Sequence, residues 1–475
     1  MRASPEEWRA ILESPVRTLL KLLLVLILLS AIVLGGAWFW AGRAAGPTLQ
    51  VRQPEQFIGL NSALELVAEA PGGRFSRLDV TLEQNGRSFP VFSLDQPAQA
   101  STKQESADRL YLSRPIGKQA LPDLQAGPAR IVVRAARPVV YGIRQAESLF
   151  TRDVQVRLDP PRVAVLSKFH YVNHGGAEFL VFTATPPDVD AGVRVGEVTY
   201  PAYPGAAVGI ADPSTRVAFF ALLPDQDLNA QVQVFARDAA GNQAIASVEH
   251  MPFAKPFGRS RIDIDNWVGR VVPPIVANTP EMQLSTEPDR IVESFVRINS
   301  ELRQRNAQTI ADLAARSAPR MLWADAFQPL ANAAVEARFA DYRTYFSQGK
   351  EVDRQVHLGF DLAVTSQVPI LSAHRGVVLH AAYLGIYGNC VIVDHGLGVQ
   401  TLYGHLSSIG VKPGDTVAKG QELGRSGTTG LAAGDHLHFT VLVAGHAVNP
   451  VEWWDPKWMQ DRVLRKITEA GGVLQ

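Results

Sequence analysis

The stretch Gly434-Asp435-His436-Leu437-His438-Phe439 places two histidines two residues apart at the start of an apolar run. Side chains at positions i and i+2 of a β-strand project from the same face, so both imidazoles can reach one cleft. From Val352 onward the chain shows short apolar runs divided by glycines, and no long helical pattern precedes Pro450. This part of the chain is therefore predicted to consist of short strands and turns.

A second motif, His357-Leu358-Gly359-Phe360-Asp361, places an imidazole and a carboxylate four residues apart. Gly359 and the apolar residues 362–364 argue against a helix, so we expect the pair at the bend of a strand end. Two histidines and one carboxylate are a sufficient set of protein ligands for a catalytic zinc ion, and they leave a position for water. Such an ion lowers the pKa of that water and polarises a carbonyl. Each motif taken by itself is also compatible with a purely structural role.

Histidine is unevenly distributed, because eight of the 11 histidines fall between His357 and His446. An even scatter would put only about two there, and imidazole is the side chain that most often binds metals or shuttles protons near neutral pH. The one cysteine, Cys390, excludes an internal disulfide framework and a multi-cysteine zinc site, and its apolar setting predicts a core position. Lys plus Arg and Asp plus Glu are equal at 46 each, so nucleic acid is not an expected partner.

Residues 22–41 form an apolar segment without a charged side chain. A helix of this length spans about 30 Å, which matches the core of a bilayer. Basic residues precede the segment and aromatic residues end it, as in a membrane anchor whose N-terminus stays in the cytoplasm. We therefore expect a single-pass protein of the cell inner membrane, with its bulk on the periplasmic side. A cleaved signal peptide is the alternative, although its apolar region is normally only about 7–15 residues long.

The length of 475 residues predicts several domains in a mainly β chain. Short alternating runs with turn residues between them, such as Gln84-Asn85-Gly86-Arg87, favour two β-sandwich-like modules, with one larger β domain as the alternative. Apolar residues at helical spacing, Ile291, Phe295, Ile298 and Leu302, predict a helix with a packed face. The expected division is a cytoplasmic N-terminus (1–21), an anchor (22–41), two β-sandwich-like modules (47–160 and 161–252), a helical connector (253–344), the histidine-rich β domain (345–455) and a C-terminal tail (456–475).

The order of motifs within residues 345–450, under a quarter of the chain, resembles the lysostaphin/LytM-type zinc endopeptidases. The resemblance implies a small, mainly antiparallel β domain with Zn2+ bound in a groove. Carried over position by position, it implies that the zinc ligands are His357, Asp361 and His438. It also implies two active-site histidines outside the ligand set, His405 and His436. Besides the two histidine motifs it rests on Gly388-Asn389, Val391-Ile392-Val393-Asp394-His395-Gly396, Thr401-Leu402-Tyr403-Gly404-His405-Leu406-Ser407, Val411-Lys412-Pro413-Gly414-Asp415, Lys419-Gly420-Gln421, Gly427-Thr428-Thr429-Gly430 and Val448-Asn449-Pro450.

Two positions depart from the pattern of this family. Thr440 stands where many members carry glutamate, and His374 lies in a loop that is usually less basic. Neither departure removes a ligand or an active-site histidine, so they bear on specificity more than on activity. Four histidines have no matching role and are expected at solvated loop or strand positions, namely His374, His380, His395 and His446.

The resemblance implies a membrane-anchored zinc endopeptidase that hydrolyses peptide bonds in bacterial peptidoglycan, with peptidoglycan peptides as substrates and cell-wall enzymes as candidate partners. His436 is expected to act mainly as general base, while His405 orients it or stabilises developing charge; the two roles could be exchanged. The alternative is a non-catalytic regulator that binds the cell wall or activates an amidase. Such regulators typically lose metal ligands, whereas this sequence keeps all three and both further histidines.

Overall fold

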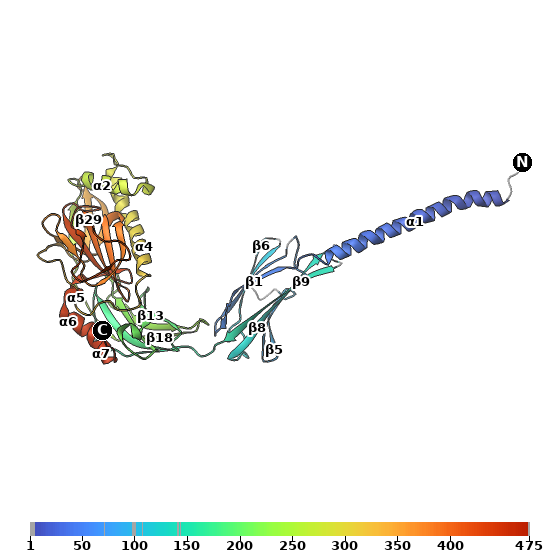
Figure 1. The fold of residues 1–475 in the computed structure, drawn as a ribbon, viewed down its shortest axis with the longest axis horizontal. Coiled ribbons are helices and arrows are strands. Elements are labelled where there is room, and N and C mark those ends of the chain that lie inside the picture. Colours follow the sequence, from blue (N-terminus) through green and yellow to red (C-terminus); the bar gives the residue numbers. More distant parts are fainter. Residues whose placement is uncertain are drawn as a thin grey trace. The chain divides into compact units, whose positions relative to one another are not determined.

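The structure, a computed structural model, describes residues 5–70, 72–96, 101–106, 108–139, 142 and 144–473. It is mainly β with one long N-terminal helix, which confirms the predicted fold class (Figure 1). The chain divides into two compact units, of which one comprises residues 1–160 with 239–242 and the other comprises residues 161–238 with 243–475. Each unit has a hydrophobic core of its own.

Helix α1 (Pro5–Ala41) carries the apolar segment of the first unit. Its residues Thr18–Trp40 are long and apolar enough to cross a membrane, and none of the most apolar window is buried. The span includes Lys21, which the charge-free segment predicted from the sequence left out. A helix of this kind fits either a membrane anchor or a signal sequence.

Two sheets of the first unit enclose its core. Strand β4 (Arg77–Gln84) buries Leu78, Val80 and Leu82 in alternation, the pattern of a strand with one face inward. Its turn to β5 (Arg87–Ser93) has φ values of 50° at Asn85 and 76° at Gly86, which confirms the predicted hairpin turn. The sheet orders are β1-β3-β7-β6 and β2-β9-β8-β4-β5, formed by β1 (Thr48–Gln53), β2 (Phe57–Ile58), β3 (Ala63–Glu69), β6 (Ser101–Ser106), β7 (Arg109–Pro115), β8 (Gly127–Val139) and β9 (Arg144–Val156) together with β4 and β5.

The second unit begins with another pair of four-stranded sheets. Their core continues into the histidine-rich domain, since the Phe219 ring lies 6.0 Å from that of Trp323 and 5.4 Å from that of Trp453. These sheets and the histidine-rich domain therefore share one apolar core. The orders are β10-β12-β16-β15 and β14-β13-β17-β18, with β10 (Arg162–Val165), β12 (Ala177–Thr185), β13 (Asp190–Val195), β14 (Val198–Pro201), β15 (Tyr203–Pro204), β16 (Thr215–Ala221), β17 (Val232–Arg237) and β18 (Gln243–Ser247); β11 (His170–Asn173) pairs with β19 (His250–Phe253).

The segment expected as a helical connector contains both helices and strands. Ile291, Phe295, Ile298 and Leu302 are all buried and cluster with Tyr345 of the histidine-rich domain, so the predicted packed face is confirmed. The helices are α2 (Val268–Asn278), α3 (Ile291–Arg297), the π-helical turn η4 (Ile298–Leu302) and α4 (Arg303–Ala314). The strands are β20 (Arg259–Asp263), which runs parallel to β22 (Asp341–Ser347), and β21 (Ala334–Ala337).

The histidine-rich domain is built on an eight-stranded sheet, with β33 beside β32. The segment expected as a C-terminal tail is helical and buries Trp458, Met459, Val463 and Ile467. The sheet order is β21-β24-β32-β28-β27-β26-β30, with β24 (Phe360–Ala363), β26 (Gly376–Tyr383), β27 (Asn389–Gly396), β28 (Val399–Leu406), β30 (Thr416–Val417), β32 (His436–Val443) and β33 (His446–Val448). The last helices are α5 (Pro450–Trp454), α6 (Pro456–Met459), the π-helical turn η6 (Gln460–Leu464) and α7 (Arg465–Glu469).

Candidate metal centre

Three strands bring the predicted metal ligands together. His357 ends β23 (Lys350–His357), while Asp361 and His438 are directly paired residues of the antiparallel strands β24 and β32. The bend between His357 and Asp361 passes close to the His438 ring, because a Cβ at Gly359 would lie only 2.6 Å from two of its atoms. Glycine is therefore the residue that lets this bend and the His438 imidazole occupy their positions.

Three side-chain atoms converge in this place. His357 Nε2 lies 2.9 Å from Asp361 Oδ1 and 3.1 Å from His438 Nδ1, and the last two atoms are 3.0 Å apart. All three residues are buried. Ligands about 2.0–2.1 Å from a tetrahedral zinc ion lie about 3.3 Å from one another, so the observed separations suit such a site.

The outer hydrogen bonds of the His357 and His438 rings determine whether the converging nitrogens carry a proton or a lone pair. His357 Nδ1 donates to the carbonyl oxygen of Arg338 at 3.1 Å, which leaves a lone pair on Nε2 of a neutral ring. Thr440 Oγ1 donates to the carbonyl oxygen of Leu358 at 3.0 Å, so it accepts from His438 Nε2, also at 3.0 Å. His438 Nδ1 then carries a second lone pair, which points to the position where His357 Nε2 and Asp361 Oδ1 also converge. Three acceptors without a proton between them repel one another unless a cation intervenes, so the donor set fits a metal ion.

Arg343 of β22 binds the other oxygen of Asp361. Its Nη2 lies 3.0 Å from Asp361 Oδ2, and its Nε lies 3.2 Å from an oxygen of Asp341. Burial opposes ionisation of Asp361, but its neighbours, His357 foremost, hold its pKa well below the usual range. Arg343 thereby orients the carboxylate with Oδ1 toward the ligand histidines. The sequence offered no signal for this residue, because only the pairing of β22 with β23 brings it to the site.

The two histidines outside the ligand set line the same cavity. His405 Nδ1 donates to the carbonyl of Thr429, and His436 Nδ1 donates to the carbonyl of Gly434, both at 2.8 Å. Their ring centroids are 4.8 Å apart, and His436 Nε2 lies 3.5 Å from Asp361 Oδ1. Burial lowers the pKa of His405 well below its usual value, whereas the pKa of His436, although opposed by burial, is raised by Asp361. Both rings keep Nε2 free of backbone partners, so each can exchange a proton there.

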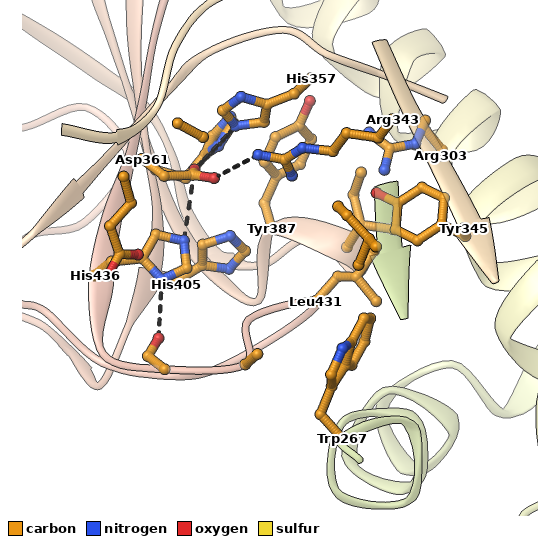
Figure 2. Close-up of a pocket in the computed structure, with 17 residues that line it drawn as sticks. Trp267, Arg303, Arg343, Tyr345, His357, Asp361, Tyr387, His405, Leu431 and His436 are labelled. Atoms are coloured by element: carbon orange, nitrogen blue, oxygen red, sulfur yellow. Dashed lines mark hydrogen bonds and ion pairs between the residues drawn. The ribbon is translucent and has the colours of Figure 1, made fainter. Parts of the chain in front are cut away.

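A cavity of about 300 Å³ lies over these residues (Figure 2). The histidine-rich domain contributes Tyr387 and Leu431 beside the five residues predicted from the sequence. The segment before it contributes Trp267 and Arg303, neither of which lies in one of the motifs found in the sequence. Residues that precede the histidine-rich domain therefore form one wall of the cavity.

The remaining histidines of the domain have other surroundings. The expectation of a solvated position was wrong for His395, which is fully buried in β27 and bonded to the carbonyl of Arg375 at 2.7 Å and to Thr401 at 2.8 Å. It was also wrong for His374, which is buried and hydrogen-bonded to Asp325. Burial lowers the pKa of His395 to about 3, so it packs as a neutral core ring. His380 and His446 are half-buried, and among the residues described none of these four lines the cavity.

Cys390 lies in the interior of the sheet. It is fully buried, as predicted, and burial raises the pKa of its thiol. It lies in the cluster with Ile392 and Leu402, so it acts as a small apolar core residue.

A convergent His–Asp–His set, with two further histidines in a cavity of a β domain, is the arrangement of a metallopeptidase domain. Residues 355–450 match Peptidase family M23, and this domain of the chain belongs to that family. The resemblance found in the sequence is thereby confirmed.

Similar proteins share this domain. An uncharacterised metalloprotease of Haemophilus influenzae is 42% identical over 96 residues, which are 20% of this chain and 20% of that protein. The peptidoglycan DD-endopeptidase ShyA of Vibrio cholerae is 40% identical over 96 residues, 20% of this chain and 22% of that protein. The catalytic domain of lysostaphin from Staphylococcus simulans is 27% identical and covers 28% of this chain and 98% of its own, with a TM-score of 0.24. The match thus spans about a fifth of the length of these curated relatives.

Proposed function

We propose that this chain is a zinc endopeptidase that hydrolyses peptide bonds in bacterial peptidoglycan, held in the inner membrane by α1 with its bulk in the periplasm. The observation that carries the proposal is the convergence of His357 Nε2, Asp361 Oδ1 and His438 Nδ1 as three unprotonated acceptors in a cavity. The similarity to the Vibrio cholerae relative, which is named a peptidoglycan DD-endopeptidase, supports the substrate class. The apolar span Thr18–Trp40 supports the anchor.

His357, Asp361 and His438 would hold the zinc ion, which supplies Lewis acidity toward a water molecule and the scissile carbonyl. His436 Nε2, 3.5 Å from Asp361 Oδ1, is the nitrogen that takes up the water proton, while its Nδ1 bond to Gly434 fixes the ring. His405 stands beside it, held by Thr429, and orients it or stabilises the developing negative charge. The two histidine roles could be exchanged, because both rings present the same nitrogen.

A non-catalytic regulator that binds the cell wall or activates an amidase remains the second candidate. It would need neither a complete ligand set nor two further histidines with oriented rings. All five side chains are present here and face one cavity. The complete set favours catalysis. Burial of polar side chains costs free energy, and a regulator would have no use for all five of them.

One experiment tests the proposal directly. Full-length protein is purified in detergent, its zinc content is measured, and it is incubated with cross-linked peptidoglycan whose fragments are separated by chromatography. We expect one zinc per chain and release of shorter peptides, and His438→Ala should lose both together because two protein ligands hold zinc poorly. A wild-type protein that binds zinc yet cuts nothing would favour the regulator.

A further inference from the structure

Arg303, the first residue of α4, lines the cavity of the candidate metal centre. Two arginines lie on this side of the cavity, and Arg343 reaches Asp361 while Arg303 lies beyond it (Figure 2). Arg343 is neutralised by ion pairs with Asp341 and Asp361. No carboxylate lies within ion-pair distance of Arg303 in the described part of the chain. Among the described residues that line the cavity, Arg303 is therefore a half-buried cation without an ion-paired carboxylate.

The Arg303 guanidinium is nevertheless held in place. Its Nε donates to the carbonyl of Asn299 at 3.1 Å, and its Nη2 donates to Asn299 Oδ1 at 2.5 Å. Asn299 is fully buried and donates in turn to Asp353 at 2.6 Å. The Asn299 side chain thus lies between Arg303 and Asp353 in this series of hydrogen bonds. It positions the guanidinium without an ion pair. Asn299 lies in the π-helical turn η4, a type of irregularity that often occurs at functional sites.

Tyr387 connects Arg303 to the metal centre. The Tyr387 ring centroid lies 5.4 Å from that of the ligand His438, and both rings line the cavity with Arg303. Arg303 therefore shares one cavity with Tyr387 and with the candidate metal ligand His438.

The donors that remain on Arg303 suit a carboxylate. A guanidinium has five N–H groups, of which Asn299 accepts two, so three are left. They include one on each terminal nitrogen, and such a pair binds both oxygens of a carboxylate through parallel hydrogen bonds. Trp267 and Tyr345, which also line the cavity, supply an apolar wall that would partly exclude water from such a pair.

We propose that Arg303 is a specificity-determining residue that binds a free carboxylate on the substrate peptide, close to the bond that is cut. The inference rests on the proposed function and narrows its substrates to peptides that carry such a carboxylate, whether a chain terminus or the side chain of a diamino acid. A helix of the segment before the peptidase domain thereby takes part in substrate recognition.

The test compares two cross-linked peptide dimers that differ in one group: one carries free carboxylates beside the cross-link, and the other carries them as amides. For wild-type full-length protein we expect kcat/KM to be about 10- to 100-fold higher on the carboxylate dimer, mainly through KM, as for a charge-assisted hydrogen-bonded pair. In Arg303→Gln this preference should fall to near one, and in Arg303→Lys it should be intermediate, because lysine keeps the charge but not the planar fork.

Arg305→Gln is the matched control, because Arg305 lies on the same helix, is exposed and does not line the cavity. It should keep the wild-type preference. Separate dimers with a terminal or a side-chain carboxylate as the only free acid then distinguish the two sources of the anion. If Arg303→Gln lowers turnover of the carboxylate and amide dimers equally, Arg303 is merely structural and the inference is overturned.

Failure of the proposed function has a different signature. If the wild-type protein cuts neither dimer, the peptidase proposal fails, and the inference is decided by calorimetric binding of the uncut dimers. A carboxylate preference in binding that Arg303→Gln removes would retain Arg303 as a recognition residue. Equal affinity for the carboxylate and amide dimers would overturn that role as well.

Discussion

At the scale of single residues, Thr440 gives His438 its orientation. Its hydroxyl donates to the carbonyl of Leu358 and accepts from His438 Nε2, so the ring keeps Nδ1 as the nitrogen that faces Asp361. Thr440 was noted in the sequence as a departure from the family pattern. In the structure, the Thr440 hydroxyl is the acceptor for the outer ring nitrogen of His438.

Replacement of Thr440 by valine should weaken zinc binding. Valine keeps the shape of threonine but offers no acceptor to His438 Nε2, and loss of such an outer partner typically lowers metal affinity about 10- to 100-fold. Competition with a chromogenic chelator measures the change. Thr416→Val, at an exposed position of β30, is the control and should bind zinc like the wild type. Unchanged affinity in Thr440→Val would show that the tautomer is set in another way.

Removal of either histidine outside the ligand set should separate zinc binding from hydrolysis. His405→Ala and His436→Ala keep all three ligands, so zinc content and folding should stay near those of the wild type. Loss of a group that transfers or orients the proton typically costs about 10²–10⁴ in rate. Zinc analysis and peptidoglycan digestion on the same preparations measure both quantities, with His380→Ala as a control from outside the cavity. Wild-type turnover in both variants would exclude the proposed mechanism.

At the scale of elements, a buried ion pair connects helix α7 to strand β12. Lys466 Nζ lies 2.8 Å from Glu178 Oε1 and 2.9 Å from the carbonyl of Phe179, and the two charged side chains are 3% and 0% exposed. Burial raises the pKa of Glu178 and lowers that of Lys466, so each partner needs the other to remain charged. The last helix, in the segment expected as a C-terminal tail, is thus bound to strand β12.

Lys466→Met should destabilise the second unit. Removal of one partner leaves Glu178 buried without its cation, and such a loss typically costs about 3–5 kcal/mol in the free energy of unfolding. Urea unfolding followed by tryptophan fluorescence measures it. The double variant Glu178→Gln with Lys466→Met removes both charges and should recover part of the loss. A single variant as stable as the wild type would mean that the pair contributes little.

At the scale of the whole molecule, the position of α1 before all the folded units predicts the topology of the chain. Alkaline phosphatase fused after residue 60 should be active, because that enzyme matures only outside the cytoplasm, whereas a fusion after residue 12 should be inactive. Basic residues on the N-terminal side of the apolar span set this orientation. An expressed but inactive fusion at residue 60 would contradict it, and release of a shortened soluble chain would favour a signal peptide.

Local patterns in the sequence determined the elements of this protein. The alternation in β4 and the Asn85-Gly86 turn predict a hairpin, and the apolar residues from Ile291 to Leu302 predict a buried helical face. Both predictions are possible because the spacing of apolar side chains along the sequence differs between a strand and a helix. The two histidine motifs likewise carry their chemistry in short spacings. The resemblance to the lysostaphin/LytM-type endopeptidases then named five candidate site residues, and all five line one cavity.

Only the tertiary structure decided what surrounds those residues. Arg343 reaches Asp361 through the pairing of β22 with β23, and Arg303 enters the cavity because α3 and α4 pack beside the peptidase domain. His395 is buried because its sheet lies inside a core shared with the preceding β-sandwich strands. These contacts join residues far apart in the chain, and no local periodicity encodes such pairings. The sequence by itself determined which side chains could supply metal ligands, and the packing of distant elements decided which charged residues lie beside them in the cavity.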